Sequence, residues 1–326
     1  MTATSVSVPG MTADDRPVAD TPDTAVADRP IPGEPAGARL LAGSPIAAGI
    51  RDQVAGDVEA FRRRHGRRPA LAVLRLGTSP AFELYARQIV RTCTRVGIEP
   101  RESRLDGRRS VARVRQRLRE LSLDPDVSGV IIQQPFPRGL SLGDVVDALD
   151  SDKDVDGITP ISAGRLAMGL DAFSPATAQA AVEILDRAGR DLEGLDAVVV
   201  GRSNVVGRPV AQLLLRRHCT VTICHSRTRD LASHTRRGDV LVVAAGSPGL
   251  VTGSMLKPGA TVVDIGINVV DGRIVGDVDA DSACAVAGAI TPVPGGVGPV
   301  TNAILVRHVM IAARRLAERE TRARRS

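Results

Sequence analysis

Apolar residues recur along the first half of the chain with two different spacings. Where they return every three or four residues, the pattern predicts a helix with one buried face; short apolar runs bounded by glycine or proline predict buried strands. The predicted elements are the helix Leu40–His65, the strand Leu71–Gly77, the helix Ala81–Val96 capped by Gly97, the helix Val111–Leu121 and the strand Val127–Pro137. This alternation is typical of a parallel sheet covered by helices.

The second half repeats the alternation without repeating the sequence. Its predicted elements are the helix Thr177–Ala188, the strand Ala197–Val200, the helix Pro209–Arg216, the strands Thr220–Cys224, Val240–Ala244 and Thr261–Ile265, and the helix Asn302–Leu316. The expected fold class is therefore α/β, with two α/β domains.

Composition limits the class of protein further. The 326 residues include no Trp, one Tyr and four Phe, so the core must consist of Val, Leu, Ile and Ala. Residues 1–36 hold six acids and two arginines among Pro, Ala and Thr, which predicts a disordered tail rather than a secretory signal. Residues 319–326 are rich in arginine and predict a basic C-terminal tail.

The charge and the cysteines exclude several functions. The net charge of +6 comes from diffuse arginines without interleaved aromatics, which argues against nucleic-acid binding. No apolar run reaches the roughly 18 residues that a membrane span requires. The four cysteines stand apart and predict buried small side chains in a reducing, cytoplasmic compartment, with no metal site.

The run Thr291–Thr301 packs three prolines and three glycines into a loop just before the last helix. Proline fixes φ and glycine permits close approach, so the loop has a dictated path with accessible backbone amides. It suits a planar polar ligand, although an ordinary tight connection would look the same.

The segment Val198–Pro209 enters a glycine turn from a strand and then opens a helix. This geometry directs backbone amides at a phosphate, with Gly201 and Gly207 as the candidate glycines. An NAD site usually has an acid at the end of the next strand, whereas this chain has His225-Ser-Arg-Thr228 there. Together with Arg202, this positive corner favours the 2′-phosphate of NADP; the alternative is that both arginines are solvated surface charges.

Several separated motifs share their order and spacing with one known family. They are QQPFP at Gln133–Pro137, KDVDG at Lys153–Gly157, SAGRL at Ser162–Leu166, GRSNVVGRP at Gly201–Pro209, VTICHSRT at Val221–Thr228, DIGIN at Asp264–Asn268 and TPVPGGVGPVT at Thr291–Thr301. In these motifs the chain resembles the methylenetetrahydrofolate dehydrogenase/methenyltetrahydrofolate cyclohydrolase family, called FolD in bacteria, over about residues 38–317.

The resemblance implies two domains with a cleft between them, in which a reduced folate faces NADP. The implied parts are a tail at 1–36, a folate-binding catalytic domain at 37–176 plus 300–318, a Rossmann-like NADP domain at 177–299 and a tail at 319–326. It also implies a homodimer, for which Thr220–Cys224 could supply the edge strand.

The resemblance assigns roles to individual residues. Tyr85 would stack on the folate ring, Asp156 would bind the pterin edge, Gln133 would take the family's catalytic-site glutamine position, and Pro294 and Gly295 would line the folate site. The residues implied for NADP are Gly201, Arg202, Ser203, Ser226 and Ile267, to which the positive corner adds Arg227. The alternatives for the first two are a core tyrosine and a turn-forming aspartate.

The chain departs from the family most clearly at Ile89. There the family has an active-site lysine, four residues after the tyrosine and on the same helix face. The two lysines of the chain, Lys153 and Lys257, lie elsewhere, so the amine is absent rather than displaced. A second departure puts Ala176 and Ala178 where the family has Cys and Pro, and QQPFP itself is a third.

The predicted function is NADP-dependent oxidation of 5,10-methylenetetrahydrofolate, with weak or lost cyclohydrolase activity. Hydride transfer needs two rings held together, whereas ring opening by water benefits from a positioned group that manages protons. Three alternatives stay open: a fully bifunctional enzyme, a non-catalytic relative that binds folate or NADP, and an NADP dehydrogenase for another substrate.

Overall fold

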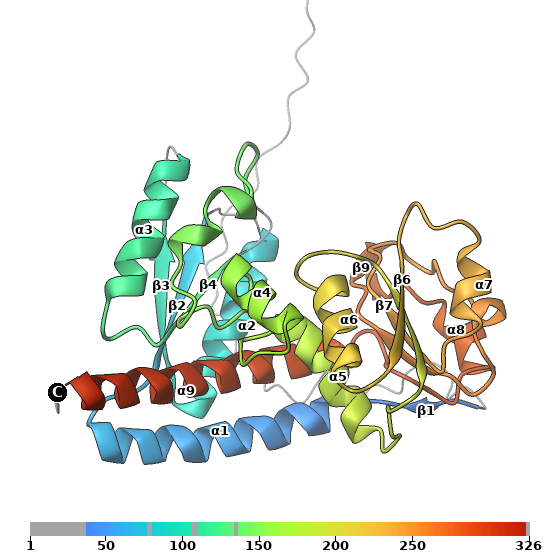
Figure 1. Cartoon of the computed structure of the whole chain (residues 1–326), viewed down its shortest axis with the longest axis horizontal. Helices are drawn as coiled ribbons and strands as arrows, with labels where there is room; N and C mark the ends of the chain where they lie inside the picture. Colours follow the sequence, from blue (N-terminus) through green and yellow to red (C-terminus); the bar gives the residue numbers. More distant parts are fainter. Residues whose placement is uncertain (1–36, 77–79, 106–109, 134–135, 324–326) are drawn as a thin grey trace, which may run out of the picture. The chain divides into compact units, whose positions relative to one another are not determined.

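The computed structural model describes residues 37–76, 80–105, 110–133 and 136–323, and of residues 80–85 only the helical backbone (Figure 1). The predicted tail at 1–36 and residues 324–326 lie outside this range. The strands are β1 (Arg39–Leu40), β2 (Ala70–Arg75), β3 (Glu99–Arg104), β4 (Gly129–Ile132), β5 (Asp196–Val200), β6 (Thr220–Cys224), β7 (Val240–Val243), β8 (Thr261–Asp264), β9 (Asn268–Val270), β10 (Arg273–Val275) and β11 (Ala289–Ile290). The α-helices are α1 (Gly43–His65), α2 (Pro80–Val96), α3 (Val111–Leu123), α4 (Pro160–Ala167), α5 (Ala176–Arg187), α6 (Gly207–Leu215), α7 (Leu231–Thr235), α8 (Ala280–Cys284) and α9 (Val297–Ala323).

The first sheet is parallel, with strand order β3-β2-β4. Successive side chains of a strand point to opposite faces, and β2 shows this clearly. Leu71 and Val73 belong to the apolar cluster that includes residues of α1, α2 and α9. Ala72 and Leu74 belong to the cluster with α3. Both faces are therefore covered, which explains why the strand is an uninterrupted apolar run.

The second sheet is also parallel, with strand order β1-β11-β8-β7-β5-β6. Val199 and Val242 pack in the cluster that contains α5 and α6. Val198 and Leu241 pack on the opposite face, in the cluster that contains α8. The two parallel sheets covered by helices confirm the predicted α/β class.

The long helix α9 connects the halves of the core. It packs along α1, with which it runs side by side in Figure 1, and also against α2, α5, β2 and β4. It continues to Ala323, so residues 319–323, which were predicted to belong to a basic C-terminal tail, are part of this helix. Arg319 pairs with Asp152, and Glu320 pairs with Arg67 at 2.7 Å between Oε1 and a guanidinium nitrogen. These ion pairs hold the last turns against the rest of the chain.

The sequence pattern did not predict several short or polar elements. β3 has the sequence EPRESR, whose polar side chains give no apolar signal, yet it pairs with β2 along its whole length. β1 and β11 have two residues each and pair with one another. This pairing places Arg39–Leu40 in the second sheet, although the predicted boundary at residue 37 assigned them to the first. Helices α4, α7 and α8 and the hairpin β9–β10 were also missed.

All four cysteines are free and buried, as the sequence predicted. Burial raises the pKa of the Cys93 thiol to about 12, so this thiol stays protonated and unreactive at neutral pH. Within the described ranges, no helix is long and apolar enough to cross a membrane.

Candidate functional site

The carboxyl ends of four neighbouring strands meet at one edge of the second sheet. Val200 of β5 is level with Cys224 of β6 and with Val243 of β7, and Val243 is level with Asp264 of β8. The loops that follow these ends carry the residues predicted for the cofactor, which are Gly201, Arg202, Ser203, Ser226, Arg227 and Ile267. The parallel register therefore brings these six residues to the edge where open α/β sheets bind ligands.

The first of these loops requires both of its glycines. Gly201 has a φ of +130°, and a Cβ there would lie 2.2 Å from the carbonyl oxygen of Ala244. A Cβ on Gly207 would lie 2.2 Å from the carbonyl oxygen of Gly201. The start of α6 thus packs directly on the turn after β5. Such a cradle, without side chains, fits the diphosphate of a dinucleotide.

Ser203 hydrogen-bonds to the backbone where α6 begins. Its Oγ accepts hydrogen bonds from the backbone amides of Val206 at 3.1 Å and Gly207 at 3.3 Å. The side chain is exposed, and its hydroxyl hydrogen remains available to a ligand oxygen. The positive end of the α6 dipole adds to the attraction for an anion.

The loop after β6 forms a compact turn that exposes Ser226 and Arg227. The backbone amide of His225 donates to Oγ1 of Thr228 at 2.9 Å, and the amide of Arg227 donates to Nδ1 of His225 at 3.1 Å. Both Arg227 and Arg202 are exposed. With no acid at this strand end, the corner suits a phosphate better than a ribose hydroxyl.

Two buried carboxylates, which the sequence interpretation missed, fix the other loops of this edge. Asp277 accepts from the amides of Ala245 at 2.6 Å and Gly246 at 2.9 Å, just beyond β7. Asp264 accepts from the amide of Gly266 at 2.8 Å, which shapes the turn before Ile267. Burial raises the pKa of Asp264 to about 6. Ile267 itself is 71% exposed, an unusual position for an isoleucine.

The predicted substrate residues Gln133 and Asp156 lie near the carboxyl edge of the first sheet. Gln133 follows β4 directly, is 3% exposed, and donates its backbone amide to the carbonyl of Leu74 at 2.9 Å. Asp154 forms a parallel bridge with Val130 of β4. This bridge carries the DVDG segment alongside β4 and brings Asp156 close to the same edge.

The two aspartates of DVDG have different environments. Asp154 is fully buried and accepts from the amides of Ile158 at 3.0 Å and Thr159 at 2.8 Å, and from the hydroxyl of Ser162 at 2.7 Å. It is the residue that builds the turn. Asp156 is only partly buried, and its Oδ1 accepts from the amide of Ala176 at 3.5 Å. Its carboxyl is therefore the one with capacity for a ligand.

Burial raises the pKa of the Asp156 carboxyl to about 7, and the nearby charge of Asp154 adds to the rise. At neutral pH this carboxyl is divided between its ionised and neutral forms. A ligand that donates two N–H groups to it favours the ionised form and lowers its pKa on binding. A perturbed carboxyl of this kind is typical of functional sites.

The loop before α9 contains a cis peptide bond between Val293 and Pro294. Gly295 has a φ of +106°, and its carbonyl oxygen accepts from the amide of Gly43 at 2.9 Å, where α1 begins. Pro294 and Gly295 therefore lie where the second sheet passes into α1 and α9. The DVDG segment contacts α9 at His308. This contact lies about 16 Å along the helix from its first residue, Val297, at a rise of 1.5 Å per residue.

Tyr85 and Ile89 lie on α2, one turn apart. The side chain of Tyr85 is outside the described residues. Ile89 is 1% exposed and belongs to the large apolar cluster of the core. Both lysine amines are bound elsewhere, Lys153 to the carbonyl of Asp124 at 2.5 Å and Lys257 to Asp239 at 2.8 Å. Position 89 is thus filled by a buried apolar side chain, and neither lysine amine is bound there.

Among the residues that the structure describes, no cluster of His, Cys, Asp and Glu has the composition of a metal site. The residues of the candidate site that sequence reasoning missed are Asp154, Asp264, Asp277 and His308. Asp154 and Asp264 lie within the motifs KDVDG and DIGIN, and His308 occupies an apolar position in the helical pattern of the last helix, whereas Asp277 left no signal.

Comparison with known proteins agrees with both halves of this arrangement. The family model of the tetrahydrofolate dehydrogenase/cyclohydrolase catalytic domain matches residues 41–156, and that of the NAD(P)-binding domain matches residues 175–317. The "Bifunctional protein FolD" of Parvibaculum lavamentivorans is 49% identical over 284 residues, which span 85% of this chain and 95% of that protein.

Solved structures give the same result. The bifunctional FolD enzyme of Campylobacter jejuni matches with a TM-score of 0.83 and 37% identity, over 85% of this chain and 98% of its own. The Trypanosoma brucei FolD, solved with NADP and an inhibitor, matches with a TM-score of 0.81 and 32% identity, over 86% and 98%.

Proposed function

Because the chain belongs to the tetrahydrofolate dehydrogenase/cyclohydrolase family, we propose that it oxidises 5,10-methylenetetrahydrofolate to 5,10-methenyltetrahydrofolate with NADP. The observation that carries the proposal is the shared edge of β5, β6, β7 and β8, where the glycine cradle and the positive corner meet. The NAD(P)-binding family model and the NADP-containing relative support the cofactor.

The residues present fit NADP in three places. Gly201, Gly207 and the amides at the start of α6 would hold the diphosphate. Arg227 and Arg202 would pair with the 2′-phosphate, and Ile267 would cover an apolar face of the cofactor. When bound, NADP accepts the hydride that leaves the methylene carbon. The chain's own task is to hold the two rings together and to keep water out.

On the substrate side, Asp156 would accept the N–H groups of the pterin edge and thereby fix its orientation. A carboxylate with two acceptor oxygens matches a pair of adjacent donors. Tyr85 and the Pro294–Gly295 backbone would line the remaining faces of the folate, and Gln133 would lie beside them. None of these groups needs to transfer a proton for the oxidation, because the step removes only a hydride.

We propose that the second activity of the family, cyclohydrolysis, is weak or lost in this chain. Water addition to the methenyl carbon benefits from a group that positions water and moves protons, worth roughly 10²–10⁴-fold. Ile89 is buried and apolar and supplies no such group.

A paired assay tests both halves of the proposal. Purified protein should reduce NADP with methylenetetrahydrofolate, and should open methenyltetrahydrofolate at less than about one hundredth of that rate. Comparable rates would refute the loss, and failure of NADP reduction would refute the dehydrogenase.

The variant Ile89→Lys sharpens the test. We expect its cyclohydrolase rate to rise by at least tenfold above wild type, with some loss of thermal stability because an amine enters a buried position. Ile89→Met is the matched control, since it changes the shape of the side chain without adding an amine. An equal gain in both variants would show that packing, not the missing amine, limits the rate.

The second candidate is the fully bifunctional enzyme. It is favoured by the bifunctional relatives, such as the FolD proteins of Parvibaculum lavamentivorans and Campylobacter jejuni. In that case a water chain or another group replaces the lysine, and the paired assay gives comparable rates.

A homodimer is also proposed, through β6. In the described part of the second sheet β6 is an edge strand, and its Ile223 is 40% exposed. A second copy of β6 would satisfy the unpaired backbone groups of this edge. Ile223→Pro, which removes an N–H that faces away from β5, should then give a monomer by light scattering, whereas an unchanged mass would refute this interface.

A further inference from the structure

A buried histidine on α9 contacts the segment that carries Asp156. His308 is 3% exposed, and its Nδ1 lies 2.8 Å from the carbonyl oxygen of Val155, the residue directly before Asp156. A carbonyl oxygen can only accept, so Nδ1 carries a hydrogen and donates it. The histidine thus holds the peptide bond that precedes the candidate substrate-binding carboxylate.

The other ring nitrogen contacts the start of α5. Nε2 of His308 lies 2.8 Å from Oε1 of Gln179, and the hydroxyl of Ser174 donates to the same oxygen at 2.8 Å. A protonated ring donates to this oxygen, whereas a neutral ring with its hydrogen on Nδ1 accepts at Nε2 and pairs with the Gln179 amide turned by 180°, which presents its N–H. Burial, together with the charges of Arg307 and Arg315, lowers the pKa of His308 to about 4, so the ring is neutral at pH 7.

The start of α5 contacts the Asp156 segment from the other side. The amide of Ala176 donates to Oδ1 of Asp156 at 3.5 Å. At Gly157, with a φ of +61°, a Cβ would lie 2.5 Å from the carbonyl oxygen of Phe173. The backbone of the two segments is therefore in direct contact. Together these contacts close a ring that runs from His308 through Val155, Asp156, Ala176 and Gln179 back to His308.

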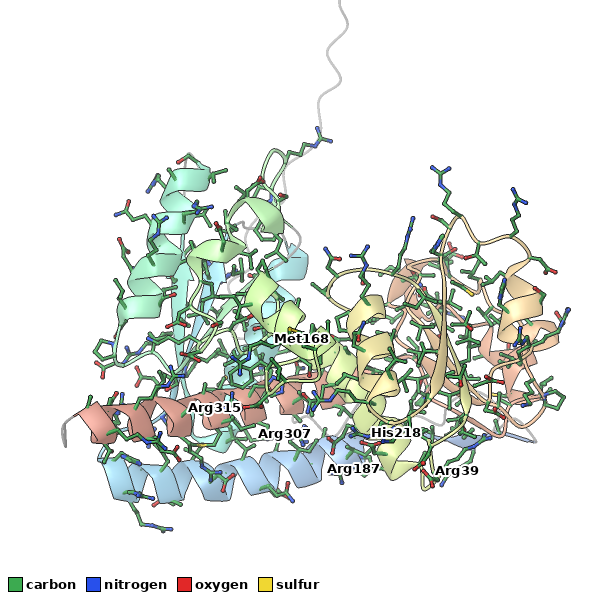
Figure 2. All side chains as sticks on the ribbon, viewed as in Figure 1. Arg39, Met168, Arg187, His218, Arg307 and Arg315 are labelled. Atoms are coloured by element: carbon green, nitrogen blue, oxygen red, sulfur yellow. The ribbon has the colours of Figure 1, made fainter. Side chains whose placement is uncertain are left out.

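A second contact from α9 fixes the same region. The ring of Phe173 lies 5.2 Å from the His308 ring between centroids, and the guanidinium of Arg315 lies 5.0 Å from the Phe173 ring. Arg315 also pairs with Asp171 at 2.7 Å. Arg315 and Arg307 both extend from α9 (Figure 2). These neighbours fix the position of the His308 ring, so its hydrogen bond holds the Val155 carbonyl in a defined place.

We propose that His308 is a positioning residue for substrate binding, which orients the Asp156 carboxylate toward the folate through Val155 and the start of α5. The proposal rests on the proposed dehydrogenase function. Ala176 and Ala178, where the chain departs from its family, are buried and carry no polar side-chain atom. The contacts of this segment with Asp156 therefore come from backbone, and α9 supplies the side chain that fixes them.

Two isosteric variants separate the two contacts of the ring. In His308→Asn the amide nitrogen replaces Nδ1 and keeps the donor to Val155, whereas in His308→Gln it replaces Nε2 and loses that donor. We expect the KM for methylenetetrahydrofolate to rise about tenfold in His308→Gln, because one buried hydrogen bond is lost, and less than about threefold in His308→Asn. The KM for NADP and kcat should change less than about threefold in both.

The pH profile adds a readout that a loss of stability alone would not move. In the wild type, the KM for the folate should rise as the pH falls through the pKa of Asp156, about 7. In His308→Gln, water reaches the loosened Asp156 carboxyl and lowers its pKa. The rise of the KM, the acid limb of the profile, should therefore move to lower pH by about one unit. In His308→Asn it should stay in place. The charged groups that face the ring and the carboxyl are Asp154, Arg307 and Arg315.

Met310→Ala is the control for stability, because Met310 is 1% exposed on the same helix and does not touch the DVDG segment by any hydrogen bond. It should lower the melting temperature and leave the KM and the pH limb unchanged. An active enzyme in which His308→Gln behaves like His308→Asn would overturn the positioning role alone. A wild-type chain that neither reduces NADP nor binds tetrahydrofolate in calorimetry would overturn the proposed function and this role together.

Discussion

At the carboxyl edge of the second sheet, the groups that would face a ligand are mostly backbone amides, whereas beside the first sheet they are mostly side chains. The cofactor edge depends on Gly201 and Gly207, whose missing Cβ atoms let a helix start meet a turn. The proposed substrate edge would depend on Asp156 and on the side chain at position 89. In the first region a substitution destroys the shape, and in the second it changes the chemistry.

This difference predicts which substitutions each region tolerates. A backbone cradle tolerates no added atom, so both of its glycines are required. At a side-chain position such as 89, a substitution changes the chemical groups and leaves the backbone in place. The predictions below test the contrast, beginning with the largest expected effect.

Gly207→Ala should break the cofactor region. The added Cβ would lie 2.2 Å from a backbone oxygen, which cannot move away cheaply. We expect NADP affinity to fall at least about 100-fold, or about 3 kcal/mol, in a fluorescence titration. Gly56→Ala on α1 is the control, because nothing lies within 4 Å of its added atom, and it should retain full affinity. Equal affinities for the two variants would contradict the cradle.

Asp156→Asn should weaken the substrate region without touching the cofactor. We expect the KM for the folate to rise about 20-fold at pH 8, through the lost charge on a hydrogen-bond acceptor. The difference should shrink below pH 6, where the wild-type carboxyl is itself protonated. KM values measured from pH 5.5 to 8.5 check this, and a gap that does not depend on pH would contradict the role of the ionised form.

The same variant carries a stability prediction. The pKa of Asp156 is raised from 3.8 to about 7, so the folded chain binds its proton more tightly than the unfolded chain does. Stability should therefore fall as the pH rises from about 4 to 7, and Asp156→Asn should remove this loss. We expect the variant to be the more stable protein at pH 8, by about 2 kcal/mol in urea unfolding, and not at pH 4.

Arg227→Ala should alter cofactor choice rather than cofactor binding as a whole. Loss of one arginine from the phosphate corner should raise the KM for NADP about tenfold and leave the KM for NAD unchanged. Arg237→Ala, at another exposed arginine, is the control for net charge. A parallel change for NADP and NAD would place Arg227 away from the 2′-phosphate.

The smallest expected effect concerns acid stability and His308. Its pKa is lowered from 6.5 to about 4, so the folded chain resists protonation that the unfolded chain accepts. Stability should therefore fall as the pH decreases from about 6.5 to 4, by about 1 kcal/mol between pH 7 and 5.5. His308→Asn should flatten this part of the curve in thermal unfolding, and an unchanged slope would assign the acid loss to other groups.

Much of the fold could be predicted because its main elements carry local patterns. The apolar runs at β2, β5, β7 and β8 and the amphipathic spacing of α1 depend only on neighbouring residues. The residues predicted for the cofactor could be placed at one edge for a related reason, since parallel strands bring their carboxyl ends together. The sequence by itself determined the α/β class, the helical frame and the position of the glycine cradle.

Only the tertiary structure decided the rest, because it depends on residues far apart in the chain. β3 is a strand through its pairing with β2, and β1 joins the second sheet through β11; neither has an apolar signal of its own. The two aspartates of DVDG look alike in sequence, but three donors bind Asp154 and leave Asp156 for a ligand. His308 forms a hydrogen bond with the carbonyl of Val155, which lies 153 residues away in the sequence. Burial strengthens this hydrogen bond, and no local sequence pattern encodes it.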